Sequence, residues 1–415
     1  MNTKINKITI LDNGLKIITS YTPRLNGVHI SLWLKTGSRY ENSDERGFSH
    51  LFEHLLFSGN NKYKNNFEIA SAVEGNGAKI NGATGRDYMF FDIESVIEYA
   101  ENAFDVLSNL ILNPLLRKKD LEKDKKIVIR EIYRSKDNHT MWASRLAYVK
   151  NFEGHSLAND PLGLEDVVSG TDIKRLKNYY KEAFIPKKAA LIVTGGLNHH
   201  NIEKLAEKYF RKWQGENTIQ PEINIPLLLR GKESSFFEKR EIKETHIRFN
   251  YLLSGVEHDN DNAALEIIAD YLGYGMSSLL SQELREMKKL VYSISSQFQI
   301  FSDAGIFSIG TSTKDPEKVI NLFKKIMEQI DKYLTKQNLN EMKAKTINLY
   351  KLQDINPFYI RDLGRGFILR DNLFTTEDHV SIIKSITKDQ LIKASRKYLS
   401  PTNLLIVALG PKAIK

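Results

Sequence analysis

The chain has 415 residues, with 60 Lys and Arg against 51 Asp and Glu, ten His and no Cys. Its 41% hydrophobic and 27% charged residues are close to the averages of globular proteins, which excludes wholesale disorder and collagen-like repeats. The absence of Cys excludes disulfides, thiolate metal sites and a cysteine nucleophile. Any metal must therefore be held by His and carboxylate side chains.

The net charge of +9 arises from two large populations of opposite sign. Lys-rich runs such as RKKDLEKDKK, at 117–126, alternate in sign as on a solvated helix face, so we expect no nucleic-acid partner. No stretch approaches the ~20 apolar residues that span a bilayer. The N-terminus also lacks the apolar core of a secretory signal. We expect a cytoplasmic protein with no membrane partner.

Short apolar runs and helical patterns alternate along the first part of the chain. Three β-like runs come first, at 8–10, 15–20 and 28–34. A helical pattern follows at 43–57. The stretch 78–93 predicts two strands around a turn at 84–87. Further helices are expected at 96–112 and from Lys119 onward.

A similar segment occurs twice, about half a chain apart. YYKEAFIPKKAALIVTGG ends at Gly196 and SRKYLSPTNLLIVALG ends at Gly410, each with a Pro-containing turn before a buried strand. Because this offset far exceeds the ~20 to 50 residues of solenoid repeats, it predicts a duplicated domain. On this segment alone, a chance likeness of two helix–turn–strand units stays open. We expect domains at 1–212 and 236–415, joined by a linker at 213–235. Each is predicted to be an α+β unit, a mostly antiparallel sheet packed with helices.

The helical pattern at 43–57 contains the sequence His50-Leu-Phe-Glu53-His54. At ~100° per residue, the helix has one apolar stripe that predicts the core face. The stripe consists of Phe48, Leu51, Phe52, Leu55 and Leu56. His50, Glu53 and His54 lie on the other side, where Phe57 suggests a partly enclosed cleft. A hydrogen-bonded core histidine and a solvated polar face are the alternatives.

Two His one turn apart can bind one metal ion, and a Glu between them can reach a metal-bound water. H-x-x-E-H is the inverted form of the H-E-x-x-H zinc protease motif. With this motif and a Glu 77 residues after His54, at Glu131, the chain resembles the pitrilysin-like M16 (inverzincin) zinc metallopeptidases, in their short processing-peptidase-like branch. The resemblance implies that His50, His54 and Glu131 bind Zn²⁺ and that Glu53 is the general base. Where the family usually has a second Glu, this chain has Asp124, so an outer-shell role for Asp124 is open.

Two further segments carry the resemblance. KINGATG is similar to the N-A-x-T signature of the family's substrate-pairing edge strand, with Gly82 in place of the usual Ala. The resemblance implies that an extended peptide pairs with this strand through its main chain. The matching residues are Asn81, Gly82, Ala83 and Thr84. Arg285 and Tyr292, seven residues apart, resemble the family's Arg/Tyr pair. They are implied to bind the substrate backbone and to stabilise the tetrahedral oxyanion across the cleft from the zinc.

These observations predict a zinc-dependent endopeptidase that hydrolyses short or unfolded peptides, bound as an added strand in an enclosed cleft. In the branch of the family that the chain resembles, catalytic subunits that lack the Arg/Tyr pair work with a partner that supplies it. Since this chain carries both the metal motif and the pair, the resemblance implies a homodimer, with a heterodimer with a related subunit as the alternative. The rival hypothesis is a non-catalytic peptide-binding or partner subunit of a heterodimeric protease.

Overall fold

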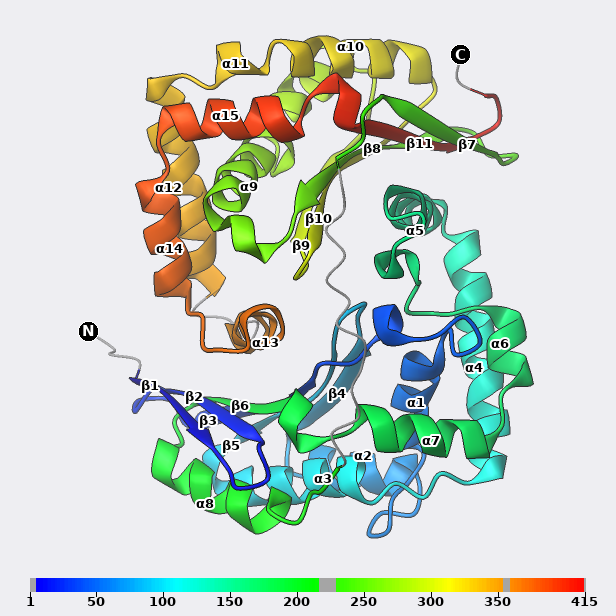
Figure 1. Cartoon of the computed structure of the whole chain (residues 1–415), viewed down its shortest axis with the longest axis vertical. Coiled ribbons are helices and arrows are strands. Elements are labelled where there is room, and N and C mark those ends of the chain that lie inside the picture. The colour runs from blue at the N-terminus through cyan, green and yellow to red at the C-terminus, as the bar shows by residue number, and fades with distance from the viewer. Residues whose placement is uncertain (1–4, 216–228, 354–358, 414–415) are drawn as a thin grey trace. The chain divides into compact units, whose positions relative to one another are not determined.

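The computed structural model describes residues 5–215, 229–353 and 359–413 (Figure 1). The contacts among these residues divide them into two compact units. Unit 1 contains 5–134, 159–215 and 359–374, and unit 2 contains 135–158, 229–353 and 375–413. Most of the predicted linker at 213–235 lies outside the described residues.

Unit 1 contains a six-stranded sheet with the strand order β1-β2-β6-β3-β5-β4. Its strands are β1 (Ile5–Ile10), β2 (Lys16–Tyr21), β3 (Gly27–Leu34), β4 (Lys79–Thr84), β5 (Met89–Val96) and β6 (Ala189–Gly195). The pairing of β2 with β6 is parallel, and the other neighbours are antiparallel. β4 is the last strand in this order and pairs with β5, so it forms an edge of the sheet.

Successive side chains of each strand point to opposite faces of this sheet, and most of the helices pack against the apolar side chains of one face. Ile30, Leu32 and Leu34 of β3 point into the large core of unit 1, while Trp33 points to the opposite face. The helices that begin in unit 1 are α1 (Phe48–Phe57), α2 (Asn66–Glu74), α3 (Ala100–Leu112), α4 (Lys118–Asp137), α6 (Glu165–Gly170), α7 (Ile173–Ala183), α8 (His199–Phe210) and α13 (Tyr359–Arg370).

The opposite face of the sheet is covered by α13, which comes from the last part of the chain. Its buried side chains pack in one cluster with Trp33 of β3 and Phe90 of β5. They are Ile360, Leu363, Phe367 and Ile368. A Cβ atom at Gly364 would lie 2.0 Å from the Trp33 ring, so the missing side chain allows the helix to approach the sheet this closely.

Unit 2 contains a five-stranded sheet with the order β7-β11-β8-β10-β9. Its strands are β7 (Ser234–Lys239), β8 (Thr245–Ser254), β9 (Ile294–Ile300), β10 (Ala304–Thr313) and β11 (Leu404–Gly410). Its helices are α5 (His139–Asn151), α9 (Asp259–Gly273), α10 (Pro316–Glu328), α11 (Ile330–Tyr333), α12 (Lys336–Gln353), α14 (Thr376–Ser385) and α15 (Lys388–Tyr398). A π-helical segment, Ser281–Met287, follows α9.

Helix α5 belongs to unit 2 although it precedes the linker in the chain. Tyr148 and Phe152 pack with residues of β8 and β10 in one buried cluster. The loop after α5 is tied to the same unit by a buried hydrogen bond of 3.2 Å between Nε2 of His155 and Oδ2 of Asp303. Each half of the sequence therefore provides one helix to the sheet of the other half, which the sequence analysis did not anticipate.

The two sheets repeat one topology. The strands β2-β6-β3-β5-β4 of unit 1 correspond in order to β7-β11-β8-β10-β9 of unit 2, and each set has one parallel pair, β2 with β6 and β7 with β11. The similar sequence segments lie at equivalent places, where a 3₁₀ turn leads into β6 and into β11. The predicted α+β fold with two duplicated halves is confirmed.

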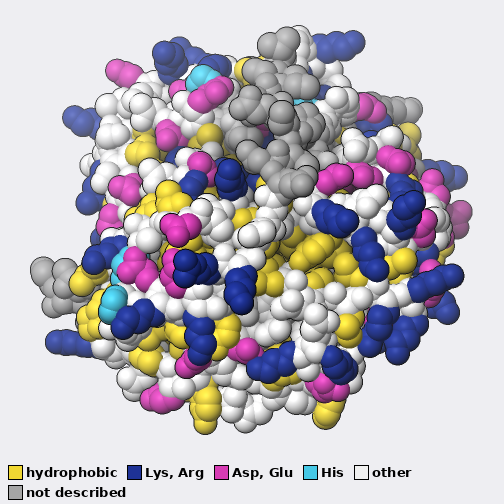
Figure 2. All heavy atoms as spheres, turned by 60° about the horizontal axis from the view of Figure 1, so that its bottom comes forward, with side chains coloured by type: hydrophobic (Ala, Val, Ile, Leu, Met, Phe, Trp, Pro, Cys, Tyr) yellow, Lys and Arg dark blue, Asp and Glu magenta, His cyan; other side chains and the backbone are white. Residues whose placement is uncertain are grey.

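Among the described residues, none of the helices combines the length and the hydropathy needed to cross a membrane. Figure 2 shows Lys and Arg side chains interspersed with Asp and Glu on the visible face, as the sequence pattern indicates.

Candidate metal centre

Helix α1 separates an apolar face from a polar one. The apolar side chains at 48, 51, 52, 55 and 56 are all buried in the core of unit 1, as the helical spacing predicts. His50 and His54, one turn apart, lie on the other side. Their side chains are 11% and 22% exposed, which places them neither in the apolar core nor on an open solvated face.

Helix α4 carries Glu131, the third predicted metal ligand. Leu121, Val128 and Ile132 anchor this helix in the core. Asp124 and Glu131, two turns apart, lie on a neighbouring face of α4, because residues seven apart stack along a helix.

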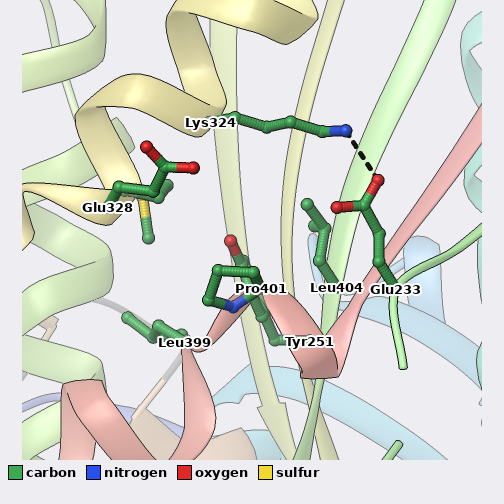
Figure 3. Close-up of a pocket in the computed structure, with 8 residues that line it drawn as sticks. Glu233, Tyr251, Lys324, Glu328, Leu399, Pro401 and Leu404 are labelled. Atoms are coloured by element: carbon green, nitrogen blue, oxygen red, sulfur yellow. Dashed lines mark hydrogen bonds and ion pairs between the residues drawn. The ribbon is translucent and has the colours of Figure 1, made fainter. Parts of the chain in front are cut away.

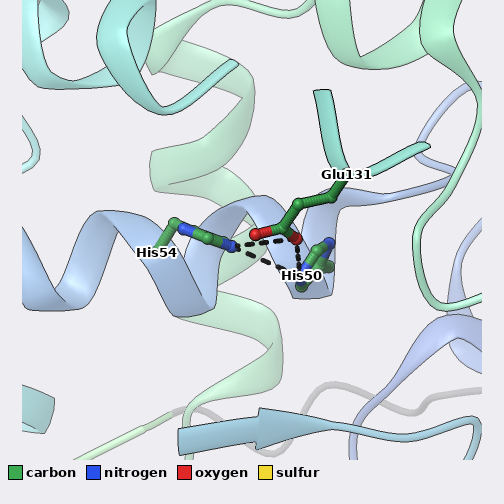
Figure 4. Close-up of side chains that lie close together, drawn as sticks. All are labelled: His50, His54 and Glu131. Carbon is green, nitrogen blue, oxygen red and sulfur yellow. Dashed lines mark hydrogen bonds and ion pairs between the residues drawn. The ribbon is translucent and has the colours of Figure 1, made fainter. Parts of the chain in front are cut away.

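His50, His54 and Glu131 converge (Figure 4). The Nε2 atoms of the two His lie 3.3 Å apart. Oε2 of Glu131 lies 3.3 Å from Nε2 of His50 and 3.6 Å from Nε2 of His54. Among the described residues this is the group of His and carboxylate side chains that could hold a metal ion.

These separations fit a tetrahedral zinc ion. Zinc bonds of about 2.0–2.2 Å at tetrahedral angles hold two ligand atoms about 3.3–3.6 Å apart. Two imidazole nitrogens and one carboxylate oxygen are also the ligand types of a catalytic zinc site, which keeps a fourth position for water. The side chains therefore lie close to the arrangement that the metal requires.

Glu53, which lies between the two His in the sequence, is held next to them by β4. The hydroxyl of Thr84 donates a hydrogen bond to its Oε2 atom. Burial raises the pKa of Glu53, whereas the Thr84 hydrogen bond opposes that shift. A carboxylate with a raised pKa is a stronger base than an exposed one, which suits Glu53 to general base catalysis.

An open pocket of about 390 Å³ adjoins this cluster. Its lining combines the polar groups of α1 and α4 with apolar side chains and the middle of β4. The lining residues are Glu53, His54, Phe57, Ser58, Asn66, Ile80, Asn81, Gly82, Lys123, Asp124 and Ile127. Asp124 is buried and accepts a 2.8 Å hydrogen bond from the Ser58 hydroxyl, and burial raises its pKa. It does not join the group of three metal-ligand candidates.

The four residues of the predicted substrate strand lie in β4, at the edge of the sheet. Asn81 and Gly82 line the pocket, and Thr84 contacts Glu53. A Cβ atom at Gly82 would lie 2.8 Å from the Phe57 ring, so glycine allows this ring to pack against the strand.

Arg285 and Tyr292 lie together in unit 2. The Arg285 guanidinium is 5.8 Å from the centre of the Tyr292 ring, which is 83% exposed. Arg285 lies in the π-helical segment Ser281–Met287, a rare geometry that is frequent at functional sites. Their placement opposite the metal cluster of unit 1 stays a prediction.

Unit 2 has a second cavity, lined in part by the Glu233–Lys324 ion pair of 2.6 Å (Figure 3). Its volume of about 20 Å³ accommodates little more than one water molecule, which excludes a peptide side chain.

Sequence reasoning missed Glu41. Its buried carboxylate accepts hydrogen bonds from two backbone N–H groups at the start of α1. The available signal was an acidic residue shortly before a helix that begins with Gly47 and has no acidic residue in its first turn.

Comparison with known proteins identifies a family of related sequences. The family model "Insulinase (Peptidase family M16)" matches residues 16–162, and "Peptidase M16 inactive domain" matches residues 172–346. An uncharacterized zinc protease of Rickettsia felis is 27% identical, with 98% of each chain covered. The uncharacterized zinc protease YmxG of Bacillus subtilis is 27% identical over 72% of this chain and 71% of its own length.

Solved structures share the fold. A protease from Helicobacter pylori has a TM-score of 0.90 at 18% identity and covers 98% of this chain and 100% of its own. A peptidase M16 inactive domain structure from Pseudomonas fluorescens has a TM-score of 0.85 at 20% identity, with 99% of both chains covered. Since two M16 models match consecutive parts of the chain and the Rickettsia felis relative extends over nearly all of it, the chain belongs to the M16 family of peptidases.

Proposed function

We propose that this chain is a zinc-dependent endopeptidase that hydrolyses short or unfolded peptides. The observation that carries the proposal is the convergence of His50, His54 and Glu131 at separations of 3.3, 3.3 and 3.6 Å, with Glu53 beside them on the pocket wall. Relatives named zinc proteases support zinc as the metal.

In this mechanism the edge strand and the pocket position the substrate. An extended peptide pairs with the open edge of β4 through main-chain hydrogen bonds, and one of its side chains enters the pocket. Because the pairing uses backbone groups, it selects extended chains rather than a particular sequence. Folded proteins are poor substrates, since they do not present a free strand.

Zinc bound by the three side chains would supply Lewis-acid chemistry, lowering the pKa of a water and polarising the scissile carbonyl. Glu53 takes a proton from the attacking water and transfers it to the departing amine nitrogen. The Thr84 hydroxyl orients the Glu53 carboxylate for this role. Arg285 and Tyr292 are proposed to bind the substrate backbone and the oxyanion.

The test is the purified Glu53→Gln variant. We expect it to keep one zinc per chain and to lose about 10²- to 10⁴-fold in the hydrolysis of a quenched peptide library, the usual contribution of a general base. Glu98→Gln, at an exposed position of the same unit, is the matched control and should keep full activity.

Full activity of Glu53→Gln would exclude the role of Glu53. A wild-type protein that binds zinc and peptides without turnover would instead favour the non-catalytic peptide-binding or partner subunit.

We also propose that the protein is a homodimer, because one chain carries both the metal cluster and the Arg285/Tyr292 pair. Light scattering during turnover should give twice the mass of the chain. An active monomer would refute the homodimer, and activity only on addition of a related subunit would favour the heterodimer.

A further inference from the structure

Helix α1 begins without a cap of its own. Its N-cap residue, Gly47, has no side chain that can accept a hydrogen bond and adopts a φ of +104°, and the first turn contains no acidic residue. A helix start leaves four backbone N–H groups without partners inside the helix. The N–H of Phe48 bonds to the carbonyl of Glu45 at 2.8 Å. The N–H groups on either side of it need acceptors from elsewhere.

Glu41, six residues before Gly47, provides these acceptors. Its Oε2 atom accepts the N–H of Gly47 and its Oε1 atom accepts the N–H of Ser49, both at 2.7 Å. The residue is 5% exposed, so water does not compete for the two bonds. Because each oxygen binds a different N–H, the carboxylate fixes both the position and the rotation of the first turn. Burial raises the pKa of this carboxyl to about 7, while its hydrogen bonds and the positive end of the helix dipole favour the ionised form.

The backbone that carries Glu41 is itself held in place. The side-chain amide of Asn159 donates to the carbonyls of Ser38 and Glu41, at 3.1 and 3.2 Å. The Ser38 hydroxyl donates in return to the carbonyl of Asn159 at 2.8 Å. Glu41 therefore connects the first turn of α1 to a loop whose backbone is fixed by hydrogen bonds with Asn159.

A second set of contacts reaches the same turn. The Ser49 hydroxyl lies 2.8 Å from the hydroxyl of Tyr179, which lies 3.0 Å from the hydroxyl of Thr36. This chain of hydroxyl contacts leads to Ser49, which directly precedes His50 in the sequence. The first turn of α1 thus carries a metal-ligand candidate at the place where helices fray most readily.

We propose that Glu41 is a positioning residue, which holds the first turn of α1 and with it His50 in the place that the metal requires. It acts through its hydrogen bonds to the backbone N–H groups of Gly47 and Ser49. The inference rests on the proposed function, since it assumes that His50 binds zinc. Outer groups that orient metal ligands typically contribute 10- to 100-fold in metal affinity.

The test compares the zinc affinity of full-length Glu41→Gln with that of the wild type, by competition with a chromophoric chelator. The amide keeps the shape of the carboxylate but places an NH₂ group against one of the two backbone donors. We expect zinc to bind about 10- to 100-fold more weakly. At saturating zinc, KM for a quenched peptide should stay unchanged, because the substrate contacts are intact. The visible absorption of the cobalt-substituted variant should differ from that of the wild type, because the ligand geometry is relaxed.

Glu45→Gln is the matched control. It removes the same charge from the same loop but leaves both Glu41 bonds to α1 in place, so its zinc affinity should equal that of the wild type. Equal losses in the two variants would overturn the proposal in favour of a general charge effect. Wild-type zinc affinity in folded Glu41→Gln would overturn it directly.

Two further outcomes separate this inference from the proposed function. A wild-type protein that does not bind zinc overturns both. If Glu41→Gln does not fold by circular dichroism, Glu41→Asp replaces it. The shorter side chain keeps the charge but cannot reach both N–H groups, so weaker zinc binding is expected. Wild-type zinc affinity in folded Glu41→Asp would then refute the inference.

Discussion

At the residue scale, Gly82 determines the shape of the pocket beside the metal cluster. A Cβ atom there would lie 2.8 Å from Cε2 of Phe57 and 3.1 Å from Cδ1 of Phe91. Phe91 is fully buried and packed on all sides, whereas Phe57 lines the open pocket. Gly82→Ala should therefore push the Phe57 ring into the pocket. We expect kcat/KM to fall more for peptides with large side chains than for peptides with small ones, measured with matched quenched peptides.

Gly170→Ala is the control for this prediction. Gly170 also lies in unit 1, but a Cβ atom there would meet nothing within 4 Å. This variant should keep the substrate preference of the wild type. An equal loss of kcat/KM for all peptides in Gly82→Ala would contradict a role of Gly82 in pocket size.

The metal cluster could be predicted from the sequence because most of its geometry is local. His50 and His54 face the same way through helical spacing alone, and the family resemblance supplied Glu131. Glu41 could not be predicted in the same way. Its carboxylate reaches α1 only because the loop before the helix folds back on itself, and no periodic pattern in the sequence records that path.

At the element scale, the contact between α13 and Trp33 depends on Gly364. A Cβ atom at Gly364 would lie 2.0 Å from Cε2 of Trp33, which is fully buried. Gly364→Ala should separate the helix from the sheet and lower the free energy of unfolding by about 1–3 kcal/mol, the usual cost of overpacking. Urea unfolding measures this loss.

Gly366→Ala, in the same helix, is the control. Its nearest contact would be 3.1 Å from Cβ of Phe374, and alanine favours the helix by about 1 kcal/mol over glycine. We expect little net change in stability. Equal stabilities of the two variants would contradict the tight contact at Trp33.

Helix α9 contains a half-buried carboxylate that makes the stability of unit 2 depend on pH. Burial raises the pKa of Asp270 to about 6. A hydrogen bond of 2.7 Å from the Thr346 hydroxyl partly opposes this rise. Since the folded state holds this proton more tightly than the unfolded state, the folded state loses stability as the pH rises from about 4 to about 6.

Asp270→Asn removes this ionisation and keeps an acceptor for Thr346. Relative to the wild type, it should gain less than about 1 kcal/mol at about pH 4 and up to about 3 kcal/mol at about pH 8. Urea unfolding across this pH range tests the prediction. Glu341→Gln, at an exposed position of α12, should show no such trend. A stability difference that does not depend on pH would contradict the ionisation of Asp270 in the fold.

Most strands and helices up to α4 could be predicted from the sequence, but the surfaces against which they pack could not. The apolar periodicity of a segment shows that a helix has a buried face, whereas the surface that the face covers depends on the path of the whole chain. The predicted helix at 43–57 was also too long, because α1 begins at Phe48. Polar turn-forming residues before Phe48 form turns that carry the loop back to the helix start.

At the scale of the whole molecule, each unit is completed by a helix from the other half of the sequence. A fragment of residues 1–215 contains α5 but lacks α13, and a fragment of 229–415 contains α13 but lacks α5. Each fragment alone should therefore fail to form a cooperative fold. In the 1–215 fragment Trp33 lacks the side chains of α13 that bury it, and in the 229–415 fragment Phe301 lacks those of α5. Co-expression should restore a soluble complex with the near-ultraviolet circular dichroism of the intact chain.

A chain cleaved within 216–228 after folding is the control and should keep its spectrum. Cooperative urea unfolding of the 1–215 fragment by itself would contradict the dependence of unit 1 on α13.

Because α13 lies far after the sheet of unit 1 in the sequence, it is synthesised long after that sheet. The sheet of unit 1 is complete at Gly195, whereas its second cover begins at Tyr359, 164 residues later. At about 5–20 residues per second, the apolar face around Trp33 stays open for about 8–33 s while the rest of the chain is made. The nascent chain is thus exposed to aggregation for many seconds, and binding of this face by a chaperone would protect it until translation ends.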